Sequence, residues 1–313
     1  MVAFTLTRRR VAAASRPSVW RLALASALLL LLGGCSLVGL AYQHADLWLL
    51  HQAESFVPLR PAQRARLEAA LRDRLAQHRA RELPAYVTLL DRAQAAAADG
   101  LTTAEVESLL SRVQALAADL VRGTAPAIAV VLADLDEAQR ARLTERLRAG
   151  DADYAADYVL PGAEKRSARR AKTARRQLAH WTGDLTAAQR ERVVELTRAW
   201  PDVADRWHAY RVSRTDGLLA LLQGRAGAAE IERYLVSRWV RHEGQPADLA
   251  RDVAATRTGM IALIVALDGS LSATQRKALL DRLRAYRSDL AALLPHDVPA
   301  VAAVGAPDTA ARD

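Results

Sequence analysis

The chain is poor in the residues that cross-link a fold or build sheets. It has one cysteine in 313 residues, so it cannot form an internal disulfide. It has only two phenylalanines and few β-branched runs, which argues against strands, whereas alanine, leucine and arginine dominate. These three residues are strong helix formers. The sequence therefore predicts an all-α, multi-helix bundle.

The motifs of the common enzyme and metal classes are also missing from the sequence. No glycine-rich phosphate loop, no His-Glu-x-x-His and no serine in a nucleophile elbow occurs. The seven histidines are scattered, and His44 and His51, two turns apart, lack a third ligand. Glu54, Glu82 and Asp202 are candidate acids, but their spacing in the sequence does not assign any two of them to a catalytic pair. We therefore predict no catalytic residue, no metal and no cofactor.

The net charge of +9 is concentrated in the first segment of the chain. The residues before Cys35 hold five arginines and no acid. The remainder carries 39 basic and 35 acidic residues, a net charge of +4. A mildly basic chain of this size argues against a dedicated nucleic-acid binder.

The segment that ends at Cys35 has the three parts of an export signal. A basic start is followed by an apolar run, Leu28 to Leu32, and by small residues. The sequence Leu32-Gly33-Gly34-Cys35 resembles a bacterial lipobox. This resemblance implies cleavage between Gly34 and Cys35, a diacylglycerol on the Cys35 sulfur and an acyl group on the new amine. Several acyl chains on one residue give stable membrane anchoring.

The lipobox resemblance also implies a location and a division of the chain. Ser36 in place of aspartate fits an outer-membrane lipoprotein that faces the periplasm of the cell envelope, rather than retention at the inner membrane. The alternative is an uncleaved membrane-spanning helix, because residues 22–42 carry no charge and are long enough to span. We predict a signal peptide (1–34), a lipidated tether (35–42), a helical domain (43–294) and a disordered tail (295–313).

A Leu-x-x-x-Gln pattern recurs four times in the predicted helical domain. Thr186 and Ser272 are expected N-caps, with Gln189 and Gln275 three residues later, which makes a capping box. Each cap contributes about 1 kcal/mol, so helix initiation explains the repeat. The four copies run from Leu59 to Gln63, Leu135 to Gln139, Leu185 to Gln189 and Leu271 to Gln275. Glycines are the expected helix stops: Gly100, Gly123, Gly150, Gly183, Gly224, Gly244 and Gly269.

Two resemblances rest on these and nearby residues. Leu185-Thr186-Ala187-Ala188-Gln189 matches the LTxxQ motif of periplasmic helical proteins typified by the chaperone Spy, over short turns only. The segments Tyr42 to Asp46, His78 to Tyr86 and Lys165 to Trp181 are similar to an uncharacterised family of Gram-negative helical lipoproteins. That resemblance covers most of the chain after Cys35, and it implies location and fold without an established activity.

One predicted helix is strongly basic, with Glu164 as its only acid. The simplest interpretation is the solvated face of a packed helix, with Ala171, Ala174 and Leu178 on the inner side. The functional interpretation is a docking face for anionic lipid or envelope polymer. The basic residues assigned to this face are Lys165, Arg166, Arg169, Arg170, Lys172 and Arg176.

Two functional hypotheses follow. The first is a lipid-anchored, non-enzymatic binding, scaffold or chaperone-like module, with the membrane and envelope proteins or unfolded clients as partners. The second is an envelope enzyme with an unrecognised carboxylate or histidine site. A polar cleft that gathers His78, Glu82 and Tyr86 would favour the enzyme, whereas an apolar, cradle-like surface would favour the binding module. The oligomeric state is not predicted.

Overall fold

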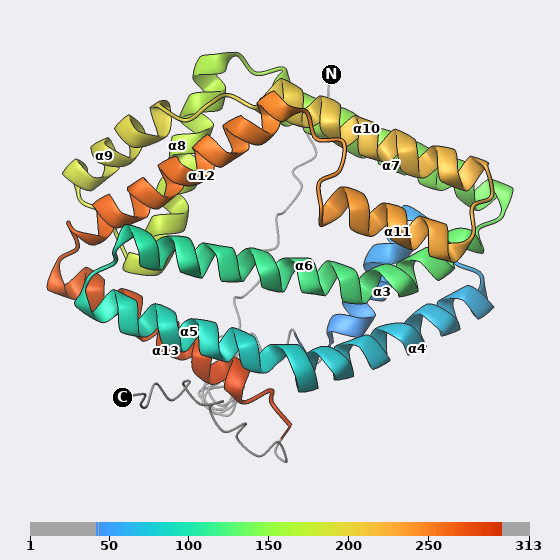
Figure 1. The fold of residues 1–313 in the computed structure, drawn as a ribbon, viewed down its shortest axis with the longest axis horizontal. Helices are drawn as coiled ribbons and strands as arrows, with labels where there is room; N and C mark the ends of the chain where they lie inside the picture. The colour runs from blue at the N-terminus through green and yellow to red at the C-terminus, as the bar shows by residue number, and fades with distance from the viewer. Residues whose placement is uncertain (1–41, 43, 296–313) are drawn as a thin grey trace, which may run out of the picture.

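The computed structural model describes residues 42 and 44–295, and every regular element in this part is helical (Figure 1). No β-strand occurs among these residues, so the all-α prediction is confirmed. The signal peptide, most of the tether and the tail beyond residue 295 lie outside the described residues. The elements are α3 (Ala45–Phe56), α4 (Pro61–Gln77), the π-helix η2 (His78–Glu82), α5 (Leu83–Asp99), α6 (Thr103–Ala133), α7 (Glu137–Tyr154), the π-helix η3 (Ala155–Val159), α8 (Ala163–Thr182), α9 (Ala187–Arg198), α10 (Ala204–Gln223), α11 (Ala228–Trp239), α12 (Ala247–Asp268) and α13 (Ala273–Ala291).

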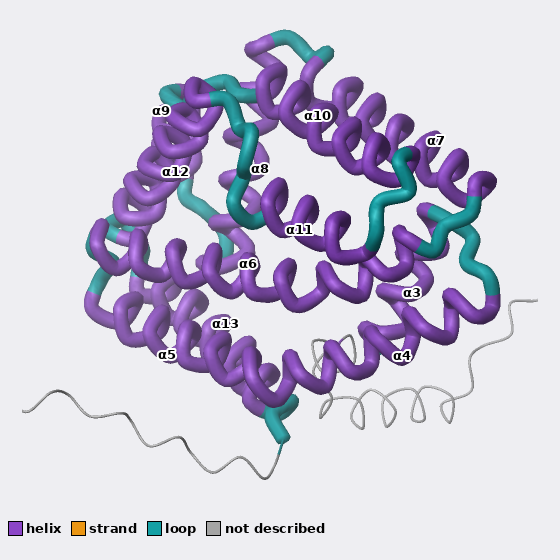
Figure 2. Tube along the Cα trace, turned by 45° about the vertical axis from the view of Figure 1, so that its right-hand side comes forward, coloured by secondary structure: helices purple, strands orange, loops and turns teal. Residues whose placement is uncertain are grey.

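Helix α6 crosses the middle of the molecule, and the other helices surround it (Figure 2). It packs against α11, α12, α4 and α5, while α13 lies along α5 and α8 pairs with α9. Apolar side chains are buried in separate clusters rather than in one centre. The largest includes Leu135, Leu143 and Ile231, and a second includes Leu185, Val193 and Leu263. The architecture is therefore an assembly of helix pairs around one long helix.

The predicted helix caps are confirmed. In α9 the Thr186 hydroxyl accepts the Gln189 N–H at 3.2 Å, and the Gln189 Oε1 accepts the Thr186 N–H at 2.9 Å. Ser272 and Gln275 make the same pair of bonds at the start of α13. At the start of α4, Pro61 is the first helical residue, where the missing N–H of a proline costs no hydrogen bond.

The caps have a second role that the local pattern does not predict. Gln189 and Gln275 face each other, and each amide donates Nε2–H to the Oε1 of the other, at 3.0 and 2.9 Å. Gln63 and Gln139 make the same reciprocal pair, at 3.1 and 2.7 Å. We call these pairs the second and the first glutamine joint. The four repeats thus associate two by two and fasten helices that are far apart in sequence.

Each glutamine in a joint also has its remaining hydrogen-bonding capacity filled. Its second Nε2–H donates to a backbone carbonyl just before the opposite helix: Gln189 to Ser270 at 3.0 Å and Gln275 to Asp184 at 2.8 Å. Its Oε1 also accepts the N–H of its own N-cap residue. All four glutamines are buried. A fully satisfied buried polar network rigidifies a core and sets its register.

Two of the predicted helix stops are wrong. Gly123 lies inside α6 and Gly150 lies inside α7. A glycine inside a helix costs about 1 kcal/mol relative to alanine, but tertiary packing overrides this preference. A Cβ at position 123 would lie 2.5 Å from the Arg74 guanidinium, which occupies the space that the glycine leaves. Gly100 and Gly183, by contrast, end helices as predicted, with positive φ values of 99° and 80°.

Candidate functional site

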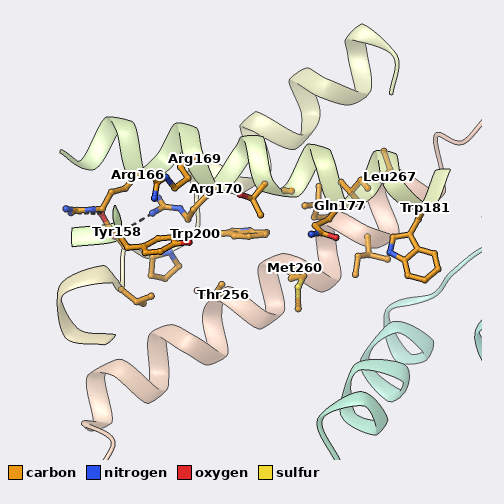
Figure 3. A pocket seen from close by; sticks show the side chains of 18 of the residues that line it. Tyr158, Arg166, Arg169, Arg170, Gln177, Trp181, Trp200, Thr256, Met260 and Leu267 are labelled. Carbon is orange, nitrogen blue, oxygen red and sulfur yellow. Dashed lines mark hydrogen bonds and ion pairs between the residues drawn. The ribbon is translucent and has the colours of Figure 1, made fainter. Parts of the chain in front are cut away.

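A cleft of about 630 Å³ lies between α8 and α12 (Figure 3). Its other walls come from the segment between α9 and α10, from the π-helix η3, and from Leu101, Leu271 and Leu279 near the start of α13 and the turn before α6. Most of its lining is apolar. The main apolar residues are Leu178, Trp181, Trp200, Met260, Leu263 and Leu267. The cleft is thus a predominantly apolar space between helices, which is a common position for ligand sites.

Trp200 is the central aromatic side chain of the cleft (Figure 3). It lies two residues beyond the end of α9 and just before Pro201, a residue that cannot continue a helix. Its indole lies against α12 at Gly259, where an added Cβ would approach the Trp200 Nε1 to 2.5 Å. The glycine therefore makes the room for the indole. The Trp200 Nε1 is buried and has no hydrogen-bond partner among the described residues.

One end of the cleft is lined by guanidinium groups, and we call it the arginine end (Figure 3). It consists of Arg166, Arg169 and Arg170 of α8 together with Tyr158. Arg166 donates to Asp202 through Nε, at 2.8 Å, and its Nη2 lies 2.8 Å from the same carboxylate. The guanidinium carbon of Arg169 lies 5.0 Å from the centre of the Tyr158 ring, a cation–π contact.

The Asp202 carboxylate remains charged in this setting. Burial raises its pKa, but hydrogen bonds from Arg166 and from the Ala204 N–H, and the charges of Arg166 and Arg170, lower the pKa by more, so the net direction is downward. Arg170 is the more distant of the two arginines, with Nη1 3.6 Å from Asp202. The Asp202 carboxylate at the arginine end is therefore already committed to Arg166.

The π-helix η3 positions the tyrosine of this end. The Leu160 N–H donates to the Ala155 carbonyl at 2.9 Å, which is the i to i+5 bond of a π turn. Tyr154 and Tyr158 stack with their ring centres 4.8 Å apart. The carbonyl of Asp157 accepts from Arg169, and the carbonyl of Val159 accepts from Arg166 at 2.7 Å. Single π turns are frequent at functional sites.

The basic helix is exposed in part, as predicted. Lys165, Arg169, Lys172 and Arg176 are exposed on α8, and Ala171 is buried on the opposite side. Arg166 and Arg170 differ from the prediction: their side chains are only 18% and 26% exposed, and both turn toward Asp202 in the cleft wall. The reason is the acid from the α9–α10 segment, which no local charge pattern shows. Nothing in the geometry tests docking on the exposed face.

The candidate acids of the enzyme hypothesis are placed in three separate ion pairs. Glu54 pairs with Arg64 at 2.6 Å, Glu82 with Arg74 at 2.7 Å and Asp202 with Arg166. No group of three or more potential metal ligands is found in the described part of the chain.

His78, Glu82 and Tyr86 do come together, around η2. The Tyr42 hydroxyl lies 2.8 Å from the His78 Nδ1, and Arg74 makes a second contact to Glu82 at 2.9 Å. Burial lowers the pKa of His78, partly opposed by the charge of Glu82, while the hydrogen bond from Arg74 lowers the pKa of Glu82. His78 is only 9% exposed. The Tyr86 ring contacts His78 edge-on, with the ring centres 5.4 Å apart. His78 and Glu82 are thus engaged by neighbouring side chains of the cluster.

The sequence alone did not identify Trp200, Gly259, Met260 or Tyr158 as site residues. The sequence does show a tryptophan followed by a proline, and separately a glycine in the middle of a long predicted helix. Neither feature indicates that the two residues pack together, because Trp200 and Gly259 are 59 positions apart in the sequence.

Comparison with known proteins gives a family match without an activity. The model of a family of unknown function, DUF6279, matches residues 55–243. The matched region includes the first three copies of the repeat and α8, and it ends before α12. No curated protein and no solved structure matches the chain.

Proposed function

The chain belongs to the DUF6279 family of unknown function, and we propose from its own geometry that it is a membrane-anchored, non-enzymatic binding protein of the cell envelope. In this proposal the cleft between α8 and α12 holds an apolar ligand. No catalytic residue and no cofactor is assigned, apart from the lipid expected on Cys35.

The observation that carries this proposal is the cleft itself. Its volume of about 630 Å³ lies within the range of about 300–1,000 Å³ that is usual for small-molecule sites. Two indoles, Trp181 and Trp200, and the thioether of Met260 provide large and adaptable apolar contact surfaces. Met260 remains 36% exposed in the cleft. Covering such apolar surface removes it from water, which is favourable.

The enzyme alternative receives less support from the geometry. The titratable cluster around η2 is the place where an acid–base site was conceivable. Its carboxylate, Glu82, is held by two contacts from Arg74, and its histidine is largely buried. A general base must reach the proton that it abstracts. A cluster whose members bind one another in the protein interior supports a structural role.

The beginning of the described chain limits how far the body can lie from a lipid on Cys35. Tyr42 is fixed to the body: its ring stacks on His78 at 5.9 Å, and its hydroxyl donates to the Leu75 carbonyl at 3.3 Å. Only seven residues lead from Cys35 to Tyr42, so they span at most about 25 Å. If Cys35 is lipidated, the body is held close to the membrane surface.

Helix α3 presents suitable side chains to such a surface. Trp48 is 63% exposed and its neighbour Leu47 is also exposed. The same helix turns Leu50 into the protein, where it packs with Leu67. Exposed tryptophans are typical of membrane–water interfaces, where one end of the side chain is apolar and the other is wet. This face supports an orientation with the start of α3 toward the lipid.

We expect Cys35→Ser to abolish acyl labelling and to leave an uncut precursor. Without the thiol no diacylglycerol can be attached, and cleavage in the lipobox pathway follows that attachment. Metabolic labelling with an alkyne fatty acid, together with the gel mobility of the chain, measures both effects. A matched Ser36→Ala variant should be labelled and processed normally. Processing before residue 35 in the Cys35→Ser variant would show that the lipoprotein assignment is wrong.

A photoreactive ligand tests the cleft. A diazirine-bearing long-chain alcohol, added to membranes that contain the full chain, should label peptides from α8, α12 and the Trp200 segment. Met260→Trp fills the cleft and should reduce this labelling about tenfold, equivalent to about 1.4 kcal/mol. Met260→Leu conserves the volume and should leave labelling unchanged. Equal labelling of a folded Met260→Trp variant and the parent chain would contradict the proposal.

Proteins are the second candidate class of partner, favoured by a separate observation on α6. Val113, Leu120 and Ile128 are exposed along this helix at about helical spacing. By length and composition α6 is also apolar enough to cross a membrane, but it is packed among α4, α5, α11 and α12. An exposed apolar stripe of this kind suits an envelope protein or an unfolded client.

A further inference from the structure

We propose that the ligand of the α8–α12 cleft is an anionic amphiphile: an acyl chain that lies in the apolar part and a carboxylate or phosphate held at the arginine end. This inference rests on the proposed function, because it names the class of ligand that the same cleft takes. It is carried by the incompletely paired charge of Arg169 and Arg170 at one end of an otherwise apolar cleft.

The three arginines differ in how many acceptors within the protein their guanidinium groups already contact. Arg166 is fully engaged by Asp202 and by the carbonyls of Val159 and Pro161, at 2.7 and 3.0 Å. Arg169, in contrast, has no carboxylate within 4 Å among the described residues, and its known contacts are a carbonyl and the face of Tyr158. A guanidinium without an acid partner is a strong site for a carboxylate or phosphate oxygen.

Arg170 adds a second incompletely used guanidinium. Its shortest ion-pair distance is the 3.6 Å to Asp202, which is longer than a hydrogen bond. Its Nε is buried and has no hydrogen-bond partner among the described residues. This Nε lies too deep for a ligand oxygen to reach, but the Arg170 side chain as a whole is 26% exposed. Its Nη groups are therefore the part of the guanidinium that an anion in the cleft can contact.

Three acids near the arginine end offset part of its positive charge. Asp202 is committed to Arg166, the Asp205 carboxylate lies 3.7 Å from the same guanidinium, and Asp157 is exposed at the cleft edge. Against them stands the whole of α8, which carries seven basic side chains and one acid. The field of α8 therefore favours a negative group at the arginine end.

The remainder of the cleft determines the orientation of the ligand. Its other acid, Asp268, is 5% exposed and fully engaged by Arg276 and by the Leu101 N–H. The middle is mainly apolar, and its polar side chains, Thr173, Gln177 and Thr256, carry no charge. An acyl chain would thus extend from the arginine end past Trp200 and Met260 toward Trp181 (Figure 3).

Head-group preference tests the inference. Diazirine probes of one chain length, with carboxylate, phosphate, hydroxyl or trimethylammonium heads, are presented to the full chain in its membrane at equal mole fraction. We expect the carboxylate or the phosphate probe to label cleft peptides about tenfold more than the alcohol, the size of one charge-assisted contact. Preferential labelling by either anion supports the inference, and labelling by only one of them separates a fatty acid from a phosphorylated lipid.

Matched variants separate the site from the general charge of α8. Arg169→Gln should remove most of the anionic preference and leave labelling by the alcohol unchanged. Lys172→Gln, one turn away on the exposed face, removes the same charge and should keep the preference. Cleft labelling by the alcohol without an anionic preference, or equal losses in both variants, would overturn this inference while the proposed function stands. Absence of cleft labelling by every probe would overturn both.

Discussion

Replacing Gln189 by leucine is expected to lower the free energy of unfolding by about 4 kcal/mol. Leucine has a similar size, so the loss comes from hydrogen bonds rather than from a cavity. The variant removes the partner of the Thr186 N–H and of the Ser270 carbonyl, and it removes two of the four hydrogen bonds of the Gln275 amide. Each unsatisfied buried group costs about 1–3 kcal/mol, reduced where water can enter. Denaturant unfolding followed by circular dichroism measures the change.

Two companion variants identify the cause. Thr186→Ala removes only the cap and should cost about 1 kcal/mol, because Gln189 still bonds across the joint. The double variant Gln189→Leu/Gln275→Leu should cost clearly less than twice the single loss, since the reciprocal pair is lost only once. If Gln189→Leu costs no more than Thr186→Ala, the repeat acts only in helix initiation and the joint contributes no stability.

The glutamine joints show where prediction from the sequence reaches its limit. A capping box is a local structure, because its donors and acceptors are three residues apart, so the spacing in the repeat was enough to predict it. The pairing of Gln63 with Gln139 spans 76 residues, and that of Gln189 with Gln275 spans 86. Four equivalent repeats allow several pairings. Only the packing of the connecting helices decides which pairing forms.

The cleft could not be predicted either, because it too depends on contacts between residues that are far apart in the sequence. The alternation of alanine and arginine in α8 correctly indicated a buried and an exposed side, and Lys165, Lys172 and Arg176 follow it. Arg166 does not follow it, because Asp202 from another element attracts it. Gly123 and Gly259 also depend on residues far away in the sequence. Gly123 makes room for the Arg74 side chain, and Gly259 makes room for the Trp200 side chain. A local pattern contains no information about such a partner.

The second large effect is expected at Asp268, where Asp268→Ala should lower the free energy of unfolding by about 3 kcal/mol. The carboxylate accepts from Arg276 at 2.7 and 3.1 Å and from the Leu101 N–H at 2.8 Å, so it joins α12, α13 and the turn at Gly100. Breaking a buried ion pair on one side costs about 3–5 kcal/mol. Arg276 keeps the carbonyls of Ala97 and Asp268, which places the loss at the lower end.

An exposed ion pair between α5 and α13 provides the control for Asp268. Arg287 of α13 lies 2.9 Å from Asp91 of α5, and both side chains are about half exposed. Asp91→Ala should therefore change the free energy of unfolding by less than about 0.5 kcal/mol, because exposed pairs are screened by water and salt. Denaturant unfolding of both variants at two salt concentrations measures the difference. Equal losses for Asp268→Ala and Asp91→Ala would show that burial gives the Asp268 contact no added strength, and that the turn at Gly100 is held by its neighbouring helices alone.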